Sequence, residues 1–111
     1  ASLLLSGQPV IHELINALND PQWEVRLAAV KALGQLSWKA QPAVPALTDS
    51  LQDEYPLVRE WSARTLGKMG MISQPAIPYL LRLTEDNAEN VSAAAREALA
   101  KIETPETTDR H

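Results

Sequence analysis

The sequence predicts an all-α fold in which three helical hairpins stack into a short α–α solenoid. The first observation is a repeat of 33 residues, in which five kinds of position return three times in the same order. They are Pro9, Pro42 and Pro75; Leu14, Leu47 and Leu80; Asp20, Asp53 and Asp86; Val25, Val58 and Val91; and Leu33, Leu66 and Leu99. The second observation is that apolar residues recur at intervals of three and four, the spacing of an amphipathic helix. A unit copied in this way indicates a stacked array, so function is sought on a surface.

Each repeat contains two apolar stripes separated by a polar break, which predicts one helical hairpin per repeat. The stripes of the first helices cover residues 10–18, 44–51 and 77–83, and those of the second helices cover 25–36, 58–69 and 91–102. Val25 and Leu81 are among the residues expected to be buried in these stripes. No segment alternates apolar and polar residues in the way that a half-buried strand does, so no strand is expected.

Polar and proline residues at the breaks predict where helices begin. Asp20 is expected to accept hydrogen bonds from the free N–H groups of the next helix, and Pro21 to occupy its first position. Pro45 and Pro78 are placed in the first turns of helices that start near residues 43 and 76, because a proline costs little there. Gly34, Gly67 and Gly70 lie near the ends of second helices, where a left-handed conformation closes a helix.

Composition excludes several classes of protein. The 111 residues are 45% hydrophobic and 22% charged, which is typical of a folded domain. The absence of cysteine excludes a disulfide framework, a zinc–thiolate site and a cysteine nucleophile. A net charge of −4 disfavours general nucleic-acid binding. The Leu3–Leu5 run is too short for a membrane span or a signal sequence, so we expect a soluble, cytoplasmic protein without a membrane partner.

Two segments of the chain resemble a known repeat family. Residues 25–34 read VRLAAVKALG and residues 42–47 read PAVPAL, and repeat 2 follows with Val58-Arg59, Leu66-Gly67 and Ala76-Ile77-Pro78. This pattern resembles the armadillo-like HEAT repeat of the phycobilisome-lyase (PBS lyase) type, and it covers about residues 8–103. Repeat 3 departs from it with Ser92 in place of Arg and Ala100 in place of Gly. The resemblance implies a right-handed superhelix with the first helices on the convex side and the second helices on the concave side.

The repeats also predict how the chain is divided. We expect an N-terminal cap or the remnant of a preceding repeat at residues 1–8, repeats at 9–41 and 42–74, a degenerate repeat at 75–103 and a polar tail at 104–111. The resemblance further implies a recurrent Asp and Arg that cap helices and bridge successive units, at Asp20, Arg26, Asp53, Arg59 and Asp86. Ser92 would then leave the last junction without its cation.

The second helices supply the candidate binding residues. Those expected on the concave face are Trp23, Leu27, Lys31 and Gln35 in repeat 1, Glu60, Trp61, Arg64 and Lys68 in repeat 2, and Asn90, Ala94, Glu97 and Lys101 in repeat 3. Trp61 takes the place of Ala28 and Ala94, so the fold does not require an aromatic ring there, and Trp is typical of binding hot spots. The alternative is that Trp61 only packs along a neighbouring helix. Trp23 is alternatively a staple at the start of its helix, and Trp38 is expected to pack between repeats.

No catalytic residue, cofactor or metal site is expected. His12, assigned to the convex surface, and His111 each lack a set of metal-ligating neighbours at helical spacing. No phosphate-binding glycine loop or nucleophile motif is present.

These observations predict a non-enzymatic scaffold that binds a protein or peptide through its concave face. The alternative, implied by the resemblance, is an accessory or subunit of a bilin (phycobilin) lyase or a related tetrapyrrole-handling protein. Duplex DNA binding is disfavoured by the acidic charge. The chain is also consistent with a piece of a longer array, and the leucines at its start with self-association through an exposed end.

Overall fold

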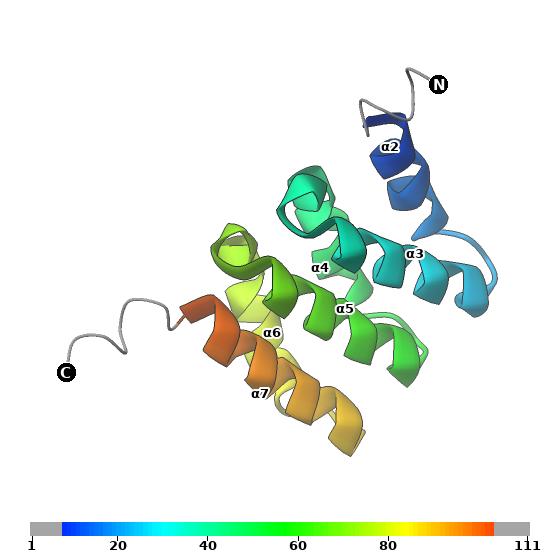
Figure 1. Ribbon diagram of the computed structural model, residues 1–111. Coiled ribbons are helices and arrows are strands. Elements are labelled where there is room, and N and C mark those ends of the chain that lie inside the picture. Colours follow the sequence, from blue (N-terminus) through cyan, green and yellow to red (C-terminus); the bar gives the residue numbers. More distant parts are fainter. Residues whose placement is uncertain (1–7, 104–111) are drawn as a thin grey trace.

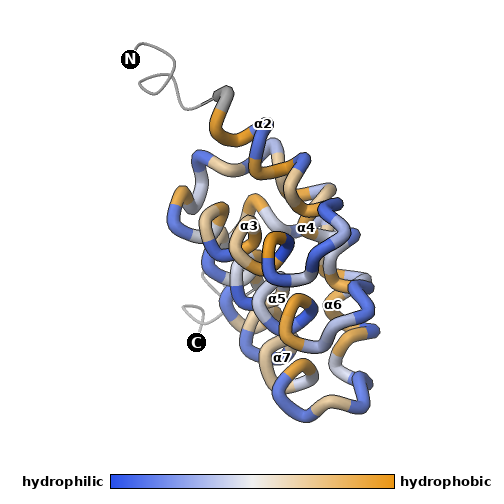
Figure 2. Tube along the Cα trace, turned by 90° about the vertical axis from the view of Figure 1, so that its right-hand side faces the viewer, coloured by the Kyte–Doolittle hydropathy of each residue, from blue (hydrophilic) through white to orange (hydrophobic). Residues whose placement is uncertain are grey.

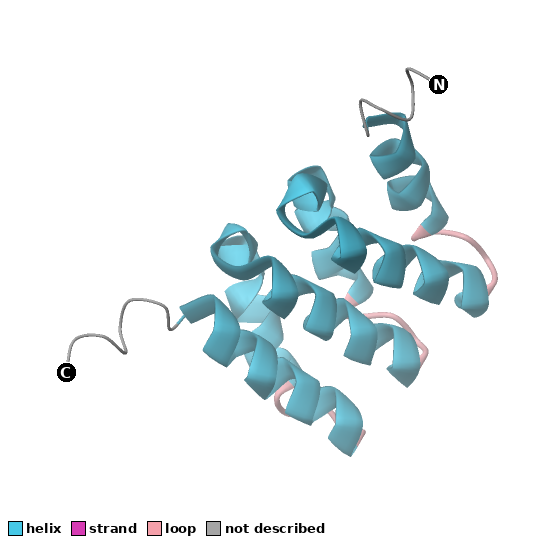
Figure 3. Ribbon diagram, viewed as in Figure 1, coloured by secondary structure: helices cyan, strands magenta, loops and turns pink. Residues whose placement is uncertain are grey.

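The computed structural model describes residues 8–103, and every described element is helical. The segments expected at 1–7 and 104–111, with Leu3–Leu5 and His111, lie outside these residues. The α-helices are α2 (Gln8–Ala17), α3 (Trp23–Leu36), α4 (Val44–Ser50), α5 (Pro56–Met69), α6 (Ile77–Leu83) and α7 (Glu89–Glu103), with 3-10 segments η1 (Ser37–Ala43) and η2 (Gly70–Ala76). Figure 3 shows no strand in the described part of the chain.

The helices form three hairpins, α2–α3, α4–α5 and α6–α7, stacked side by side. Figure 1 shows α3, α5 and α7 in one layer with α4 and α6 behind it. Helix α5 packs against both α3 and α7, so each second helix contacts the second helix of the next unit. The all-α solenoid of three hairpins predicted from the sequence is therefore confirmed.

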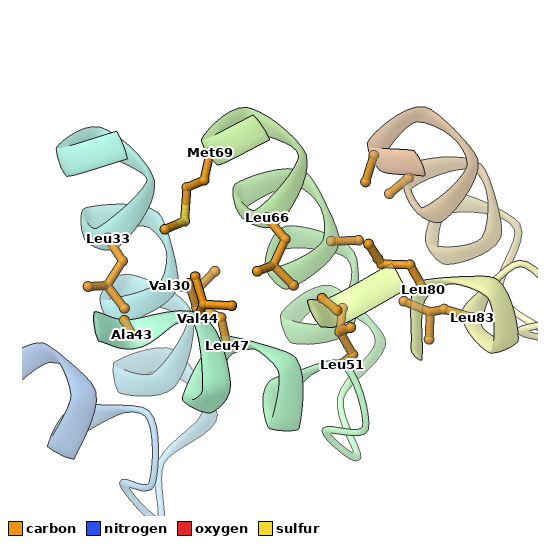
Figure 4. Packing of buried hydrophobic residues seen from close by; sticks show 14 of the residues in the cluster. Val30, Leu33, Ala43, Val44, Leu47, Leu51, Leu66, Met69, Leu80 and Leu83 are labelled. Atoms are coloured by element: carbon orange, nitrogen blue, oxygen red, sulfur yellow. The ribbon is translucent and has the colours of Figure 1, made fainter. Parts of the chain in front are cut away.

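The core lies between the two layers of helices. Figure 2 shows hydrophobic residues recurring along each helix between hydrophilic ones. In Figure 4 the second helices supply Val30, Leu33 and Leu66 to this layer, and α4 supplies Val44 and Leu47. All five side chains are almost completely buried. Because each unit is only two helices thick, it buries its apolar stripe against its neighbours.

Two residues expected in buried stripes are exposed. Val25 is 39% exposed, whereas its counterparts Val58 and Val91 are fully buried. Within residues 8–103 no hairpin lies on the outer side of α3, so nothing covers Val25 as earlier units cover Val58 and Val91. Leu81 is 53% exposed, whereas Leu80 and Leu83 of the same helix are buried. The predicted burial of Val25 and Leu81 was wrong.

The prolines at the breaks take two different positions relative to the helices that follow them. Helices α4 and α6 begin at Val44 and Ile77, with Pro45 and Pro78 in their first turns, which confirms the expected starts to within one residue. Helix α3 begins at Trp23, so Pro21 precedes the helix and the position predicted for it was wrong.

Each repeated aspartate closes a turn two residues ahead and does not cap the helix. The Asp20 carboxylate accepts the N–H of Gln22 at 2.9 Å, and Asp53 and Asp86 repeat this contact with Tyr55 and Ala88 at the same distance. Gln22 and Tyr55 are the N-cap residues of α3 and α5, and neither makes a side-chain capping bond. The prediction that each Asp accepts N–H groups of the helix was therefore wrong, because the N–H that it accepts belongs to the residue just before the helix.

The glycines separate into one helix-ending residue and two sites of close approach. Gly70 ends α5 with a φ of 71°, as predicted. Gly34 and Gly67 lie within α3 and α5, and their assignment to helix closure was wrong. They allow neighbouring second helices to approach: a Cβ on Gly67 would lie 2.8 Å from Ala98 Cα. Ser37 ends α3 with a φ of 53° at the position where the next repeat has Gly70.

Trp38 also differs from its prediction. It lies on η1 and is 67% exposed, with the Lys39 ammonium 5.8 Å from its ring centroid. Because most of the Trp38 side chain is exposed, its predicted role in packing between repeats was wrong.

Candidate interaction surface

Successive units are joined by paired arginine–aspartate bridges. Arg26 Nε donates to Asp53 Oδ2 at 2.7 Å and its Nη2 donates to Asp53 Oδ1 at 3.1 Å. Arg59 and Asp86 repeat this arrangement at 3.0 and 3.2 Å. Each guanidinium also donates to a carbonyl of its own turn, Arg26 to Asp20 at 2.8 Å and Arg59 to Asp53 at 2.7 Å. These four groups are largely buried, and such bidentate pairs fix orientation as well as contributing energy.

The bridges shift the pKa values of their groups. The hydrogen bond that Arg26 donates to Asp53 raises the pKa of the guanidinium, against its desolvation by burial. Burial alone would raise the pKa of Asp86, but the hydrogen bonds from Arg59 and from the Ala88 N–H, with the guanidinium charge, hold it below its ordinary value. The Asp86 carboxylate is thus kept ionised by the bridge that it completes.

Each bridging arginine reaches forward to the aspartate of the following unit. The junction between the second and third units is therefore completed by Arg59, and Ser92 plays no part in it. Ser92 Oγ instead donates to the carbonyl of Glu89 at 3.2 Å, within its own helix. The expectation that Ser92 deprives the last junction of its cation was wrong for the described units, because the direction of the bridge could not be read from the repeat alone.

Trp61 lies on α5 beside two cations. Its indole is half-buried, and part of it packs against the core. The Lys31 ammonium of α3 is 4.6 Å from the ring centroid, and the Arg64 guanidinium, one turn along α5, is 5.2 Å from it. Both distances are within the range of cation–π attraction. The ring thus fills space next to the neighbouring helix and also contributes to the surface.

Two shallow hollows flank α5 on the side away from the first helices. One, of about 230 Å³, lies toward α7 and the other, of about 160 Å³, lies toward α3. Trp61, Arg64 and Lys68 line both of them. We call this surface the second-helix groove and define it by its larger polar and aromatic residues: Lys31, Gln35, Trp61, Arg64, Lys68, Glu97 and Lys101. Small residues line the rest of it, among them Gly34, Gly67, Ala94 and Ala98.

Four of the residues expected on the concave face do not line these hollows: Trp23, Leu27, Glu60 and Asn90. Trp23 stacks on Tyr55 of the next unit, with ring centroids 5.3 Å apart and planes 18° from parallel. Leu27 is half-buried against the core. Glu60 is only 9% exposed. The burial of Glu60 contradicts its assignment to a free face. Trp23 and Leu27 are only partly buried, so their part in partner binding stays a prediction.

Glu60 is the centre of a polar contact between α5 and α7. Its Oε1 accepts a hydrogen bond from the Asn90 side-chain amide at 2.8 Å, and its Oε2 pairs with Arg64 at 3.0 Å. Asn90, which was also expected on the concave face, is thereby joined to the preceding unit. The two side chains thereby join neighbouring helices. Glu60 is buried in this contact, whereas Asn90 remains exposed.

The sequence analysis missed a larger groove on the side of the first helices. It has a volume of about 570 Å³ and is lined mostly by apolar groups, including Pro42, Pro45, Ile72, Pro75 and Tyr79. The signal for it was present, because Ile72 and Tyr79 stand where the preceding repeat has Lys39 and Ala46. The Arg82 guanidinium lies 5.2 Å from the Tyr79 ring.

The described residues bring together no group of three side chains that could hold a metal ion. No helix among residues 8–103 is both long and apolar enough to cross a membrane. His12 is exposed on α2, one of the first helices.

Comparison with known proteins identifies the type of repeat. A family model described as HEAT repeats matches residues 11–100, which covers the three hairpins except for residues 8–10 and 101–103. No curated protein matches the chain. The match is to HEAT repeats in general, so the phycobilisome-lyase type, and the bilin-handling role that it implies, stay predictions.

Proposed function

The chain belongs to the HEAT-repeat family, and from this premise we propose that it is a non-enzymatic scaffold that binds a protein or peptide along the second-helix groove. HEAT repeats generally serve as protein-interaction scaffolds, and solenoids present extended concave surfaces for this purpose. The groove crosses α3, α5 and α7, so a bound segment would contact all three units.

The observation that carries the proposal is the position of Trp61. Ala28 and Ala94 fill the same repeat position, so a large indole is not needed to stack the units. Its ring lines both hollows and is accompanied by the cations of Lys31 and Arg64. Trp and Arg dominate binding hot spots because they bury a large area and retain a polar group.

The test uses selected peptides and a matched pair of variants. A random peptide library displayed on phage is selected against the whole chain, and the selected peptides are titrated against Trp61→Ala and Tyr79→Ala. Tyr79 is the matched control, since it is an aromatic residue with an arginine three residues later, on the opposite side of the molecule. Urea unfolding of each variant shows whether it is folded, because Trp61 is half-buried.

We expect Trp61→Ala to weaken binding of the selected peptides at least tenfold and Tyr79→Ala to change it less than twofold. Selected peptides that bind folded Trp61→Ala as well as the parent protein would refute the proposal. So would peptides that lose binding to Tyr79→Ala alone, because these would occupy the groove on the first-helix side.

A further inference from the structure

The second-helix groove has a charge opposite to that of the chain. The whole sequence carries a net charge of −4. The two hollows are lined by four cations, Lys31, Arg64, Lys68 and Lys101, and by one carboxylate, that of Glu97. A concentration of one charge sign in a shallow groove attracts ligands of the other sign.

Three of these cations form no ion pair within the described residues 8–103. Arg64 is committed to Glu60 at 3.0 Å. Within the part of the chain that the structure describes, no carboxylate pairs with the ammonium groups of Lys31, Lys68 or Lys101. Lys31 lies over the Trp61 ring, and a cation–π contact leaves the other N–H groups of an ammonium free to donate.

The spacing of the cations follows from the repeat. Lys68 and Lys101 occupy the same position in consecutive repeats, on α5 and α7, which pack directly against each other. Packed helices lie about 8–10 Å apart between their axes. In a polyproline II segment, residues three apart project on the same side and are about 9 Å apart. In a β-strand, residues on one side are two apart and separated by only about 7 Å.

We propose that the second-helix groove binds an acidic segment of a partner protein, in an extended conformation that presents a carboxylate at every third residue. This inference rests on the proposed function and names the chemistry of the partner. Two carboxylates would pair with Lys68 and Lys101 on neighbouring helices, and a side chain between them would lie near the Trp61 ring.

A protein segment fits this groove better than a nucleic acid does. Glu97 lies among the cations and would repel a continuous row of phosphates, and the overall charge of −4 opposes a polyanion. A peptide can place an uncharged residue opposite Glu97. It can also lay an aliphatic or aromatic side chain on Trp61, for which a phosphate backbone has no equivalent.

The experiment uses labelled peptides of twelve residues and the whole chain. One peptide has Glu at every third position in a Pro/Ala background, a second has Gln at those positions, and a third has the same number of Glu residues in one block. Binding is measured by fluorescence anisotropy at two salt concentrations. The protein variants are the double substitution Lys68→Gln with Lys101→Gln, and a charge-matched control, Lys39→Gln with Arg82→Gln.

We expect the Glu peptide to bind at least tenfold more tightly than the Gln peptide and at least threefold more tightly than the block peptide. The variant with Lys68→Gln and Lys101→Gln should bind the Glu peptide at least tenfold more weakly than the parent protein, and the control variant less than twofold more weakly. Binding to the parent protein should weaken as the salt concentration rises. Equal binding of the Glu and Gln peptides overturns the charge assignment, and equal binding of the block peptide overturns the spacing. Equal loss in both variants means that only net charge is sensed, and also overturns the proposal.

Two further outcomes separate this inference from the proposed function. If the selected peptides depend on Trp61 but are not acidic, the groove is a binding site and the partner chemistry stated here is wrong. A single-stranded oligonucleotide that binds more tightly than the Glu peptide and requires Lys68 and Lys101 would assign these cations to nucleic acid and overturn the inference.

Discussion

Replacing Gly67 with alanine tests how closely the last two hairpins are packed. A Cβ at this position would lie 2.8 Å from Ala98 Cα and 3.0 Å from Ala98 Cβ. The first of these atoms belongs to the backbone of α7, so it cannot rotate away and the whole helix must shift. Overpacking of this kind typically costs about 1–3 kcal/mol, and a clash with backbone belongs at the upper end of that range.

The alanine also gains helix propensity, about 1 kcal/mol relative to glycine in a helix interior. We therefore expect Gly67→Ala to lower the free energy of unfolding by about 2 kcal/mol, a net of the two effects. For a chain of this size that corresponds to a fall in melting temperature of roughly 8 °C. Urea unfolding followed by far-ultraviolet circular dichroism measures the first quantity, and a thermal scan measures the second.

Gly34 provides the matched control, because it occupies the same position one repeat earlier. The residue that faces Gly34, as Ala98 faces Gly67, is Thr65. The three atoms nearest to a Cβ added at Gly34 all belong to the Thr65 side chain, with Oγ1 at 3.1 Å. That side chain can yield, although Oγ1 also donates to the Val30 carbonyl at 3.2 Å. Gly34→Ala should thus change the free energy of unfolding by less than about 1 kcal/mol. If Gly67→Ala is as stable as Gly34→Ala, the close approach of α5 and α7 is refuted.

Three further predictions concern single side chains. Ser62 Oγ is a buried side-chain oxygen without a hydrogen-bond partner among residues 8–103, and the other repeats have alanine at this position. Ser62→Ala should therefore raise the free energy of unfolding, measured by urea titration, by about 1 kcal/mol or more. An unchanged or lower free energy of unfolding would contradict this. Ser37 has a φ of 53°, so Ser37→Gly should raise the melting temperature by removing strain of about 1 kcal/mol, and a lower melting temperature would show that the conformation is unstrained. Because the pKa of Asp86 is lowered in the folded state, its contribution to stability is present above its ordinary value of about 3.9 and is lost as the pH falls through the folded value. The difference in urea midpoint between the parent protein and Asp86→Asn should accordingly narrow as the pH falls below about 4. A difference that stays constant would exclude the Arg59–Asp86 bridge as its cause.

The fold could be predicted from the sequence because the 33-residue period and the helical spacing of apolar residues indicate the same helices. Both depend on residues that every unit must bury, such as Leu33 and Leu66, and on prolines that only a first turn accepts, such as Pro45. These are local rules, and they hold in each copy of the repeat. Helix starts were consequently predicted to within one residue for α4 and α6.

The candidate site was harder to predict from the sequence, because which face of a helix is free depends on the helices that pack against it. Trp23 and Glu60 have the spacing of groove residues, yet Tyr55 and Asn90 of the following unit engage them. The direction of the Arg59–Asp86 bridge likewise depends on how one unit is placed against the next. The repeat period identifies which residues are equivalent, but it does not show which unit each of them contacts.

The groove on the first-helix side was missed for a related reason. Tyr79 was counted within neither an apolar stripe nor a charged face. It lies on α6, and the stacking of successive hairpins brings it beside Pro42 and Pro45 of the preceding unit. A residue-by-residue comparison of repeats, which singled out Trp61 in the second helices, would have singled out Tyr79 in the first.

The assignment of partner binding to the second helices is tested most directly by nuclear magnetic resonance. Backbone amide resonances of the whole chain are followed while the Glu peptide is added. Changes should concentrate on residues 60–68 and 94–101 and near Lys31, with little change in α4 and α6. Changes that concentrate on α4, η2 and Tyr79 instead would place the interaction surface on the first-helix side and contradict the assignment.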